Sequence, residues 1–129
     1  MTDVAARNKR NRANGARWQS DLRNGLRGDG LDVERLVLTG KEDEGDHVIR
    51  DPWALTPPPK FVVIEAKAGV LHPAEFVRQA VLEADHFAKH RGLDRGLVQG
   101  IAVAKRKGMN WRDAYVLTTL REYLGLGRS

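Results

Sequence analysis

The sequence predicts an α/β domain with a mixed β-sheet flanked by helices. Two apolar, β-branched runs, Phe61–Lys67 and Val98–Ala104, have the length and composition of buried strands. Between them, residues 73–90 carry apolar side chains at helical spacing, which predicts a helix that connects the two strands. A helical crossover favours a parallel pair of strands, whereas the shorter runs before it can pair as an antiparallel meander. The predicted order is α-β-β-β-α-β, with an added strand and a short C-terminal helix.

The N-terminal segment differs from the rest of the chain. Residues 1–12 show no apolar period, so we expect a flexible basic arm without regular structure. Residues 13–129 are expected to form a single domain, because a chain of 129 residues is long enough for one hydrophobic core but not for two.

Three short elements precede the central strand. Residues 13–27 are expected to form a helix, because three apolar side chains follow one another at intervals of four. These side chains are Trp18, Leu22 and Leu26. Residues 31–38 and 46–50 are expected to be strands, and the loop between them is acidic and bracketed by glycines.

The ends of the later elements carry their own signals. Pro73 suits the first position of the crossover helix, where its missing N–H costs nothing, and Gly92 suits its end. Residues 114–118 are expected to form the last strand. A Thr-x-x-Glu capping box, which is typical of a helix N-terminus, then starts a short helix at Leu120–Leu124.

Composition excludes several classes of function. The chain contains no cysteine, which excludes disulfides, thiolate zinc sites and cysteine nucleophiles. No apolar run approaches the length of a membrane span, and the N-terminus is too polar for a signal peptide. We therefore expect a cytoplasmic protein that has no membrane partner.

Positive charge is concentrated at the N-terminus. The net charge is +5, and the first 27 residues contain seven basic side chains against two acidic ones. This imbalance predicts an arm that binds a polyanion, although a basic arm can also be a solubilising tail. A second basic cluster, at 105–107, favours nucleic acid. The residues assigned to DNA binding are Arg7, Lys9, Arg10, Arg12, Arg17, Lys105, Arg106 and Lys107.

A set of charged residues stands at the ends of two predicted strands. Glu65 and Lys67 lie two residues apart, which places them on one face of a strand, and Asp46 precedes another strand. Two carboxylates and a backbone carbonyl, that of Ala66, are adequate ligands for Mg²⁺. Lys67 could then orient a water molecule or stabilise the transition state of phosphodiester hydrolysis.

Two other interpretations of the polar residues stay open. Glu65 and Lys67 can be a structural ion pair with Asp46 as a turn residue, because Glu-x-Lys is a common sequence. His86 and His90 have the spacing of two zinc ligands on a helix, but the sequence offers no obvious third ligand.

The charged set resembles the motif of a known nuclease fold. Asp46 followed by Glu65-Ala66-Lys67, on two strands after an initial helix, looks like the PD-(D/E)xK or restriction-endonuclease-like core. Over residues 16–126, the chain more closely resembles Holliday junction resolvases encoded by phages of actinobacteria. The stretches that carry this resemblance are Leu-Asp-Val-Glu-Arg-Leu at 31–36, Asp-Glu-Gly-Asp at 43–46, Ile-Glu-Ala-Lys at 64–67 and Val-Ala-Lys-Arg at 103–106.

The resemblance implies an enzyme of DNA recombination and repair. The resemblance implies a homodimer that cuts four-way DNA junctions. It further implies that cleavage uses Mg²⁺, for which Mn²⁺ can substitute, and no small-molecule cofactor. Asp46 and Glu65 then correspond to metal ligands and Lys67 to the catalytic lysine. Two rivals are a nicking or flap-type nuclease of the same fold and an inactive protein that binds branched DNA.

Two glutamines are assigned to the site by the same resemblance. Related nucleases often have a glutamate on the first helix, where this chain offers Gln19 or Asp21. Either residue could take that place, and the loss of the acid would weaken a second metal position. Gln79 resembles a glutamine that some relatives point at the site, but it can also lie on a solvated helix face.

Overall fold

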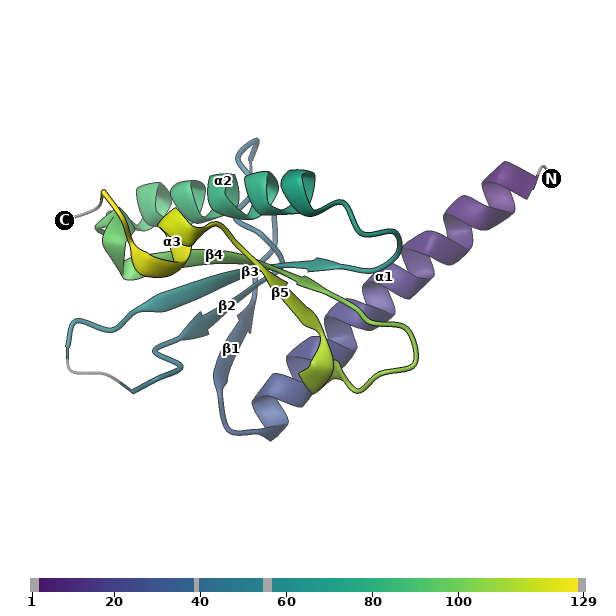
Figure 1. Cartoon of the computed structure of the whole chain (residues 1–129), viewed down its shortest axis with the longest axis horizontal. Coiled ribbons are helices and arrows are strands. Elements are labelled where there is room, and N and C mark those ends of the chain that lie inside the picture. Colours follow the sequence, from purple (N-terminus) through teal and green to yellow (C-terminus); the bar gives the residue numbers. More distant parts are fainter. Residues whose placement is uncertain (1–2, 39, 55–56, 128–129) are drawn as a thin grey trace.

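The computed structural model describes residues 3–38, 40–54 and 57–127. Five strands form one sheet in the order β1-β2-β3-β4-β5, with helices on both faces (Figure 1). The strands are β1 (Asp32–Arg35), β2 (His47–Arg50), β3 (Phe61–Lys67), β4 (Val98–Ala104) and β5 (Tyr115–Leu117). The helices are α1 (Asp3–Gly28), α2 (Pro73–Arg91) and α3 (Leu120–Leu124), with 3₁₀ turns η1 (Arg95–Leu97) and η2 (Trp111–Asp113).

The sheet is mixed, as predicted. β3 lies at its centre and pairs in parallel with β4, because α2 carries the chain back across the sheet between them. The other three pairings are antiparallel. The α/β class, the order of the strands and helices and the central position of β3 are therefore confirmed.

Each face of the sheet is covered by a different helix. Trp18 and Leu22 of α1 are buried against Ile64 and its neighbours on one face, and the Trp18 indole donates a hydrogen bond to the carbonyl of Val103 (3.2 Å). On the other face, Phe87 of α2 packs against Val63. Because side chains alternate along β3, Glu65 and Lys67 lie on the α2 face.

Gly100 allows α2 to approach the sheet closely. A Cβ atom at this position of β4 would lie 2.4 Å from the carbonyl oxygen of Ala80, so only glycine fits without a shift. Ala80 and Ala84 are fully buried at this contact. The close approach brings the inner face of α2 over the end of β3.

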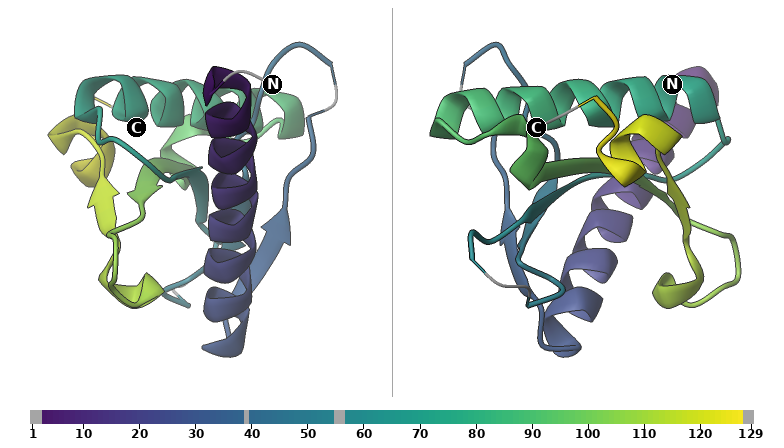
Figure 2. Two further views of the ribbon diagram at one scale, coloured as in Figure 1. Left: turned by 90° about the vertical axis from the view of Figure 1, so that its right-hand side faces the viewer. Right: turned by 60° about the vertical axis from the view of Figure 1, so that its left-hand side comes forward.

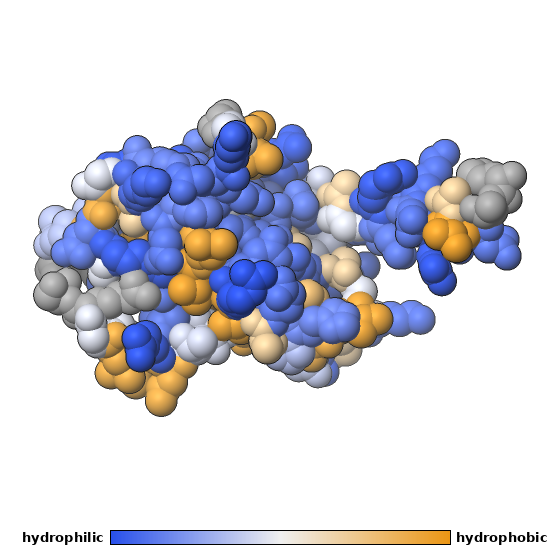
Figure 3. Space-filling view, turned by 90° about the horizontal axis from the view of Figure 1, so that it is seen from above, coloured by the Kyte–Doolittle hydropathy of each residue, from blue (hydrophilic) through white to orange (hydrophobic). Residues whose placement is uncertain are grey.

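The α1 helix begins earlier than the sequence predicts. It starts at Asp3 rather than near residue 13, so the expected irregular arm over residues 1–12 is wrong for residues 3–12. Alanine, arginine and lysine favour helix without any apolar partner, which explains a helix in a segment that lacks an apolar period. This part of α1 stands away from the body and is mostly hydrophilic (Figures 1 and 3).

The ends of α2 and α3 agree closely with expectation. Pro73 is at the start of α2, and Gly92 ends it in a left-handed conformation (φ 62°). Thr119 caps α3 by accepting a hydrogen bond from the Glu122 N–H. β1 and β5 are shorter than predicted. Within the described ranges, no helix is long and apolar enough to cross a membrane.

Candidate functional site

The register of β2 against β3 brings two distant carboxylates together. Asp46 directly precedes β2, and its N–H donates a hydrogen bond to the carbonyl of Ile64 (2.9 Å). One oxygen of its side chain, Oδ2, accepts a hydrogen bond from the N–H of Ala66 (2.8 Å). Asp46 therefore lies beside the end of β3, next to Glu65. It extends the pairing of β2 with β3 by one residue before β2 begins.

Lys67 is held by an ion pair and a hydrogen bond. Its Nζ lies 3.3 Å from Oε1 of Glu65, and it donates a hydrogen bond to Oε1 of Gln79 (2.8 Å). The amide nitrogen of Gln79 donates in turn to Oε1 of Glu65 (3.3 Å). The lysine also lies over the ring of Phe76, 5.2 Å from its centroid, a cation–π contact.

Gln79 therefore lies at the predicted site. It projects from the second turn of α2 and contacts both Glu65 and Lys67, rather than lying on a solvated helix face. A single amide that donates to the carboxylate and accepts from the ammonium fixes the geometry of both groups. Its catalytic role stays a prediction.

A third carboxyl group, Glu83, was not predicted from the sequence. It lies on the inner face of α2 with an exposed fraction of 1% and within hydrogen-bonding reach of Glu65. A signal was present, because position 83 falls in the apolar stripe of α2 between Ala80 and Phe87, at helical spacing. An acidic residue in a buried stripe is costly unless it has a function.

The site contains several neighbouring carboxyl groups, and their burial and proximity raise the pKa values of two of them. Burial, followed by the negative charge of Glu65, raises the pKa of Asp46 from 3.8 to about 7. The hydrogen bond from Ala66 and the charge of Lys67 oppose this shift. Burial and the adjacent Glu65 likewise raise the pKa of Glu83 far above the ordinary range of a carboxyl group.

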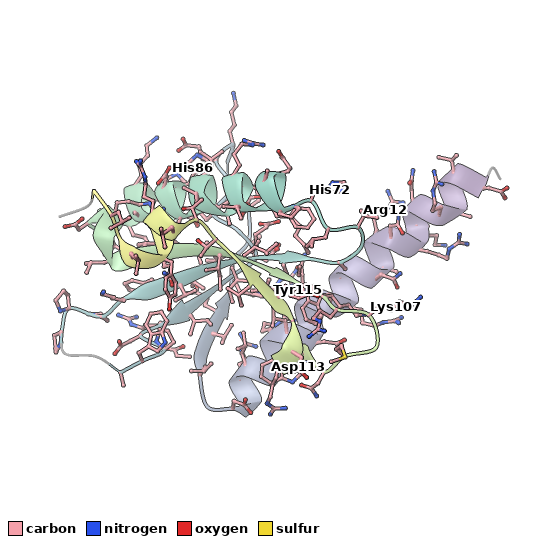
Figure 4. All side chains as sticks on the ribbon, in the orientation of Figure 1. Arg12, His72, His86, Lys107, Asp113 and Tyr115 are labelled. Carbon is pink, nitrogen blue, oxygen red and sulfur yellow. The ribbon has the colours of Figure 1, made fainter. Side chains whose placement is uncertain are left out.

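The loop before Asp46 is fixed to α2 by ion pairs. His90 lies between two loop carboxylates, with Nε2 2.9 Å from Oε1 of Glu42 and Nδ1 2.7 Å from Oε2 of Glu44. His86, labelled in Figure 4, contacts the carbonyl oxygen of Asp43 through its Nδ1 (2.7 Å). These contacts anchor the loop that carries Asp46, and they raise the pKa of His90 above its ordinary value.

Gln19 lies on the helix that covers the opposite face of the sheet from Glu65. Its backbone carbonyl is 3.1 Å from Nε2 of His47. His47 is fully buried, and this burial lowers its pKa. Asp21, the other candidate on this helix, is exposed. The role of a Gln19 or Asp21 side chain in the site stays a prediction.

Basic residues lie at the same end of the molecule as the site. Lys105, at the start of the loop after β4, donates its N–H to the carbonyl of Lys67 (2.8 Å). Figure 2 (left) looks onto this end, where α1 lies beside the segments that follow β3 and β4, and Figure 4 labels Arg12 and Lys107 there. The exposed cations among the predicted DNA contacts are Arg7, Lys9, Arg10, Arg12, Arg17, Lys105 and Lys107.

Two of the basic residues also stabilise the fold. The guanidinium of Arg106 lies 4.8 Å from the ring centroid of Tyr115 and donates to the carbonyl of Asp113 (3.3 Å). Arg112 pairs with Asp29 (2.7 Å). The cations best placed to contact a partner are therefore the lysines of this loop and the basic residues of α1.

The donor set suits a hard divalent cation at a site with few protein ligands. In the described part of the chain, no group of three or more His, Asp or Glu side chains is placed to hold a metal ion. Mg²⁺, however, is commonly bound by one or two carboxylates together with water and substrate oxygens. Asp46 and Glu65 provide two carboxylates, and the buried Oε2 of Glu65 accepts no hydrogen bond from a described residue. The carbonyl of Ala66 projects to the same side of β3 as its N–H, toward Asp46.

Two grooves in the surface of the described residues lie away from the site. One groove of about 630 Å³ runs between α2 and α3, and another of about 360 Å³ lies beside Trp53 and Tyr123. None of the site residues lines either groove.

Comparison of the chain with protein-family models, with curated proteins and with solved structures found no match.

Proposed function

We propose that this protein is a metal-dependent endonuclease with a restriction-endonuclease-like PD-(D/E)xK core. We further propose that it cuts branched DNA, with the four-way Holliday junction as its substrate. The observation that carries the proposal is the convergence of Asp46, Glu65 and Lys67 at one corner of the sheet, with Gln79 joining the last two. This arrangement has the residue types that phosphodiester hydrolysis requires.

The proposed chemistry divides between the cation and the side chains. Asp46 and Glu65, with the carbonyl of Ala66, would hold Mg²⁺, or Mn²⁺ in its place. The bound ion would lower the pKa of a water molecule and neutralise charge on the phosphate. Lys67, fixed by Glu65 and Gln79, presents a positive charge to the phosphate without a cost of reorganisation.

The charge distribution supports DNA as the substrate. Exposed arginines and lysines of α1 and of the loop after β4 lie at the end of the molecule that carries the site. Phosphate contacts of this kind position a protein on DNA without reading its sequence. We propose a homodimer, since two sites related by a two-fold axis can cut the two strands of a symmetric junction, and we place the enzyme in the cytoplasm.

Cleavage of a labelled four-way junction tests the proposal. Wild type, Glu65→Gln and the control Glu75→Gln are assayed on junction, flap and linear duplex, in Mg²⁺ and in EDTA. Glu75 is matched because it is an exposed glutamate on α2 whose carboxylate pairs with Arg78 (2.6 Å) and is not one of the proposed metal ligands. We expect paired, symmetric cuts by wild type and the control, and none in EDTA or with Glu65→Gln.

Two other results would overturn the proposal in different ways. Tight junction binding without cleavage in either Mg²⁺ or Mn²⁺ would leave an inactive protein that binds branched DNA. Single cuts, or a preference for flaps, would instead indicate a nicking or flap-type nuclease of the same fold.

A further inference from the structure

Glu83 is a buried carboxyl group that the proposed chemistry does not use. Its exposed fraction is 1%, and no described N–H or O–H group donates a hydrogen bond to either of its oxygens. Oε2 of the neighbouring Glu65 is likewise buried and without a donor. Three acceptor oxygens of two neighbouring carboxyl groups are therefore buried without a donor among the described residues.

A shared proton cannot satisfy these three oxygens. One proton between Glu65 and Glu83 makes one hydrogen bond, which involves two oxygens and leaves the third buried and unsatisfied. The cost of such a group is about 1–3 kcal/mol. A divalent cation, by contrast, accepts several carboxylate oxygens at once.

The surroundings of Glu83 are negative and closely packed. Asp43, Asp46 and Glu65 are close enough for their negative charges to repel a charged Glu83. Lys67 pairs with the other oxygen of Glu65, Oε1. Gly45 packs directly against the carboxyl group, because a Cβ there would lie 3.0 Å from Oε2 of Glu83. The group is thus fixed in place and faces an excess of negative charge.

We propose that Glu83, together with Glu65, binds a divalent cation and is a metal ligand of the site. The inference builds on the proposed function, and it adds a second carboxylate pair, Glu65 and Glu83, to the pair formed by Asp46 and Glu65. Position 83 lies in the apolar stripe of α2, so a leucine or methionine would serve the fold better. A function in cation binding accounts for the glutamate.

Metal binding to the full-length protein tests the proposal without reference to DNA. Protein freed of metal with EDTA is titrated with Mn²⁺ by calorimetry, for wild type, Glu83→Gln, Glu83→Met and the control Glu75→Gln. We expect both Glu83 variants to bind Mn²⁺ at least about tenfold more weakly, since even outer-shell changes at metal sites cost 10–100-fold. Their melting temperatures in EDTA should equal or exceed that of wild type, because a buried, unsatisfied group has been removed.

The outcomes separate this inference from the proposed function. Mn²⁺ affinity within twofold of wild type in either folded Glu83 variant would overturn the inference, even if the wild type cleaves junctions. Weakened Mn²⁺ binding in a protein that cuts no DNA would support the inference and overturn the nuclease proposal. Absence of Mn²⁺ binding by wild type would overturn both.

Discussion

The raised pKa of Asp46 predicts how stability depends on pH. An unfolded aspartate loses its proton near pH 4, whereas Asp46 in the folded protein keeps it until about pH 7. Between these values the folded state binds one more proton than the unfolded state, so the free energy of unfolding falls as pH rises. Asp46→Asn removes this dependence while keeping an oxygen that can accept from the N–H of Ala66.

The size of the effect follows from the shift. One pKa unit corresponds to about 1.4 kcal/mol, so a change from 3.8 to about 7 sets a ceiling of about 4 kcal/mol. In EDTA, the free energy of unfolding of Asp46→Asn relative to wild type should rise with pH by up to about 1.4 kcal/mol per unit from pH 4 to 7, then level off. His90, whose pKa is also raised, gives a slope of the same sign, but it is present in both proteins and cancels.

Urea denaturation between pH 4 and pH 8.5 measures this difference. The control Asp94→Asn removes one exposed charge from a turn residue that accepts from the N–H of Gly96 (3.0 Å), far from the site. It reports the part of the effect that comes from net charge alone. Parallel curves for Asp46→Asn and wild type would refute the reasoning, because they would show that Asp46 is not buried beside a second charge.

Two further predictions concern a buried ion pair and the basic residues of α1. Glu122→Gln should lower the free energy of unfolding by up to about 3 kcal/mol in a thermal or urea melt without changing Mn²⁺ affinity. It removes the buried negative charge that pairs with Arg95 (2.9 Å), although Arg95 keeps its pair with the more exposed Asp85. An unchanged melt would contradict this prediction. Combined Arg→Gln changes at 7, 10 and 17 should reduce the salt dependence of junction binding by up to about 3 in log–log slope. Arg78→Gln, on α2, is the control, and an unchanged slope for the triple variant would exclude α1 from the DNA interface.

The sequence was most informative where burial is greatest. β3 and β4 have the predicted bounds, Phe61–Lys67 and Val98–Ala104, because each contains a run of four apolar residues that leaves little choice of structure. The bounds of β1 and β5 were less predictable, since edge strands are short and partly exposed. Residues 3–12 of α1 were not predicted to be helical because periodicity reports contacts, and the side chains of this segment are mostly exposed.

The site was predictable only where a local pattern carries it. Asp46, Glu65 and Lys67 stand at strand ends in the sequence, and the resemblance added Gln79, which the structure places against Glu65. The ion pairs of the acidic loop with His90 could not be foreseen, because they join residues 46 and 48 positions apart. Contacts of that range depend on the packing of α2, which Gly100 controls.

Glu83 shows why the acidic corner is better explained by function than by folding. The position of Glu83 in the apolar stripe of α2 works against stability, and so does the burial of Asp46 next to Glu65. Each places a carboxyl group near other carboxyl groups with little positive charge to oppose them. Lys67 pairs with a single oxygen of Glu65, Oε1. If the corner served only the fold, replacing its acids would be harmful or neutral in every assay. We expect instead that Asp46→Asn and Glu83→Gln stabilise the protein in EDTA and weaken its binding of Mn²⁺, an opposition that only a binding site explains.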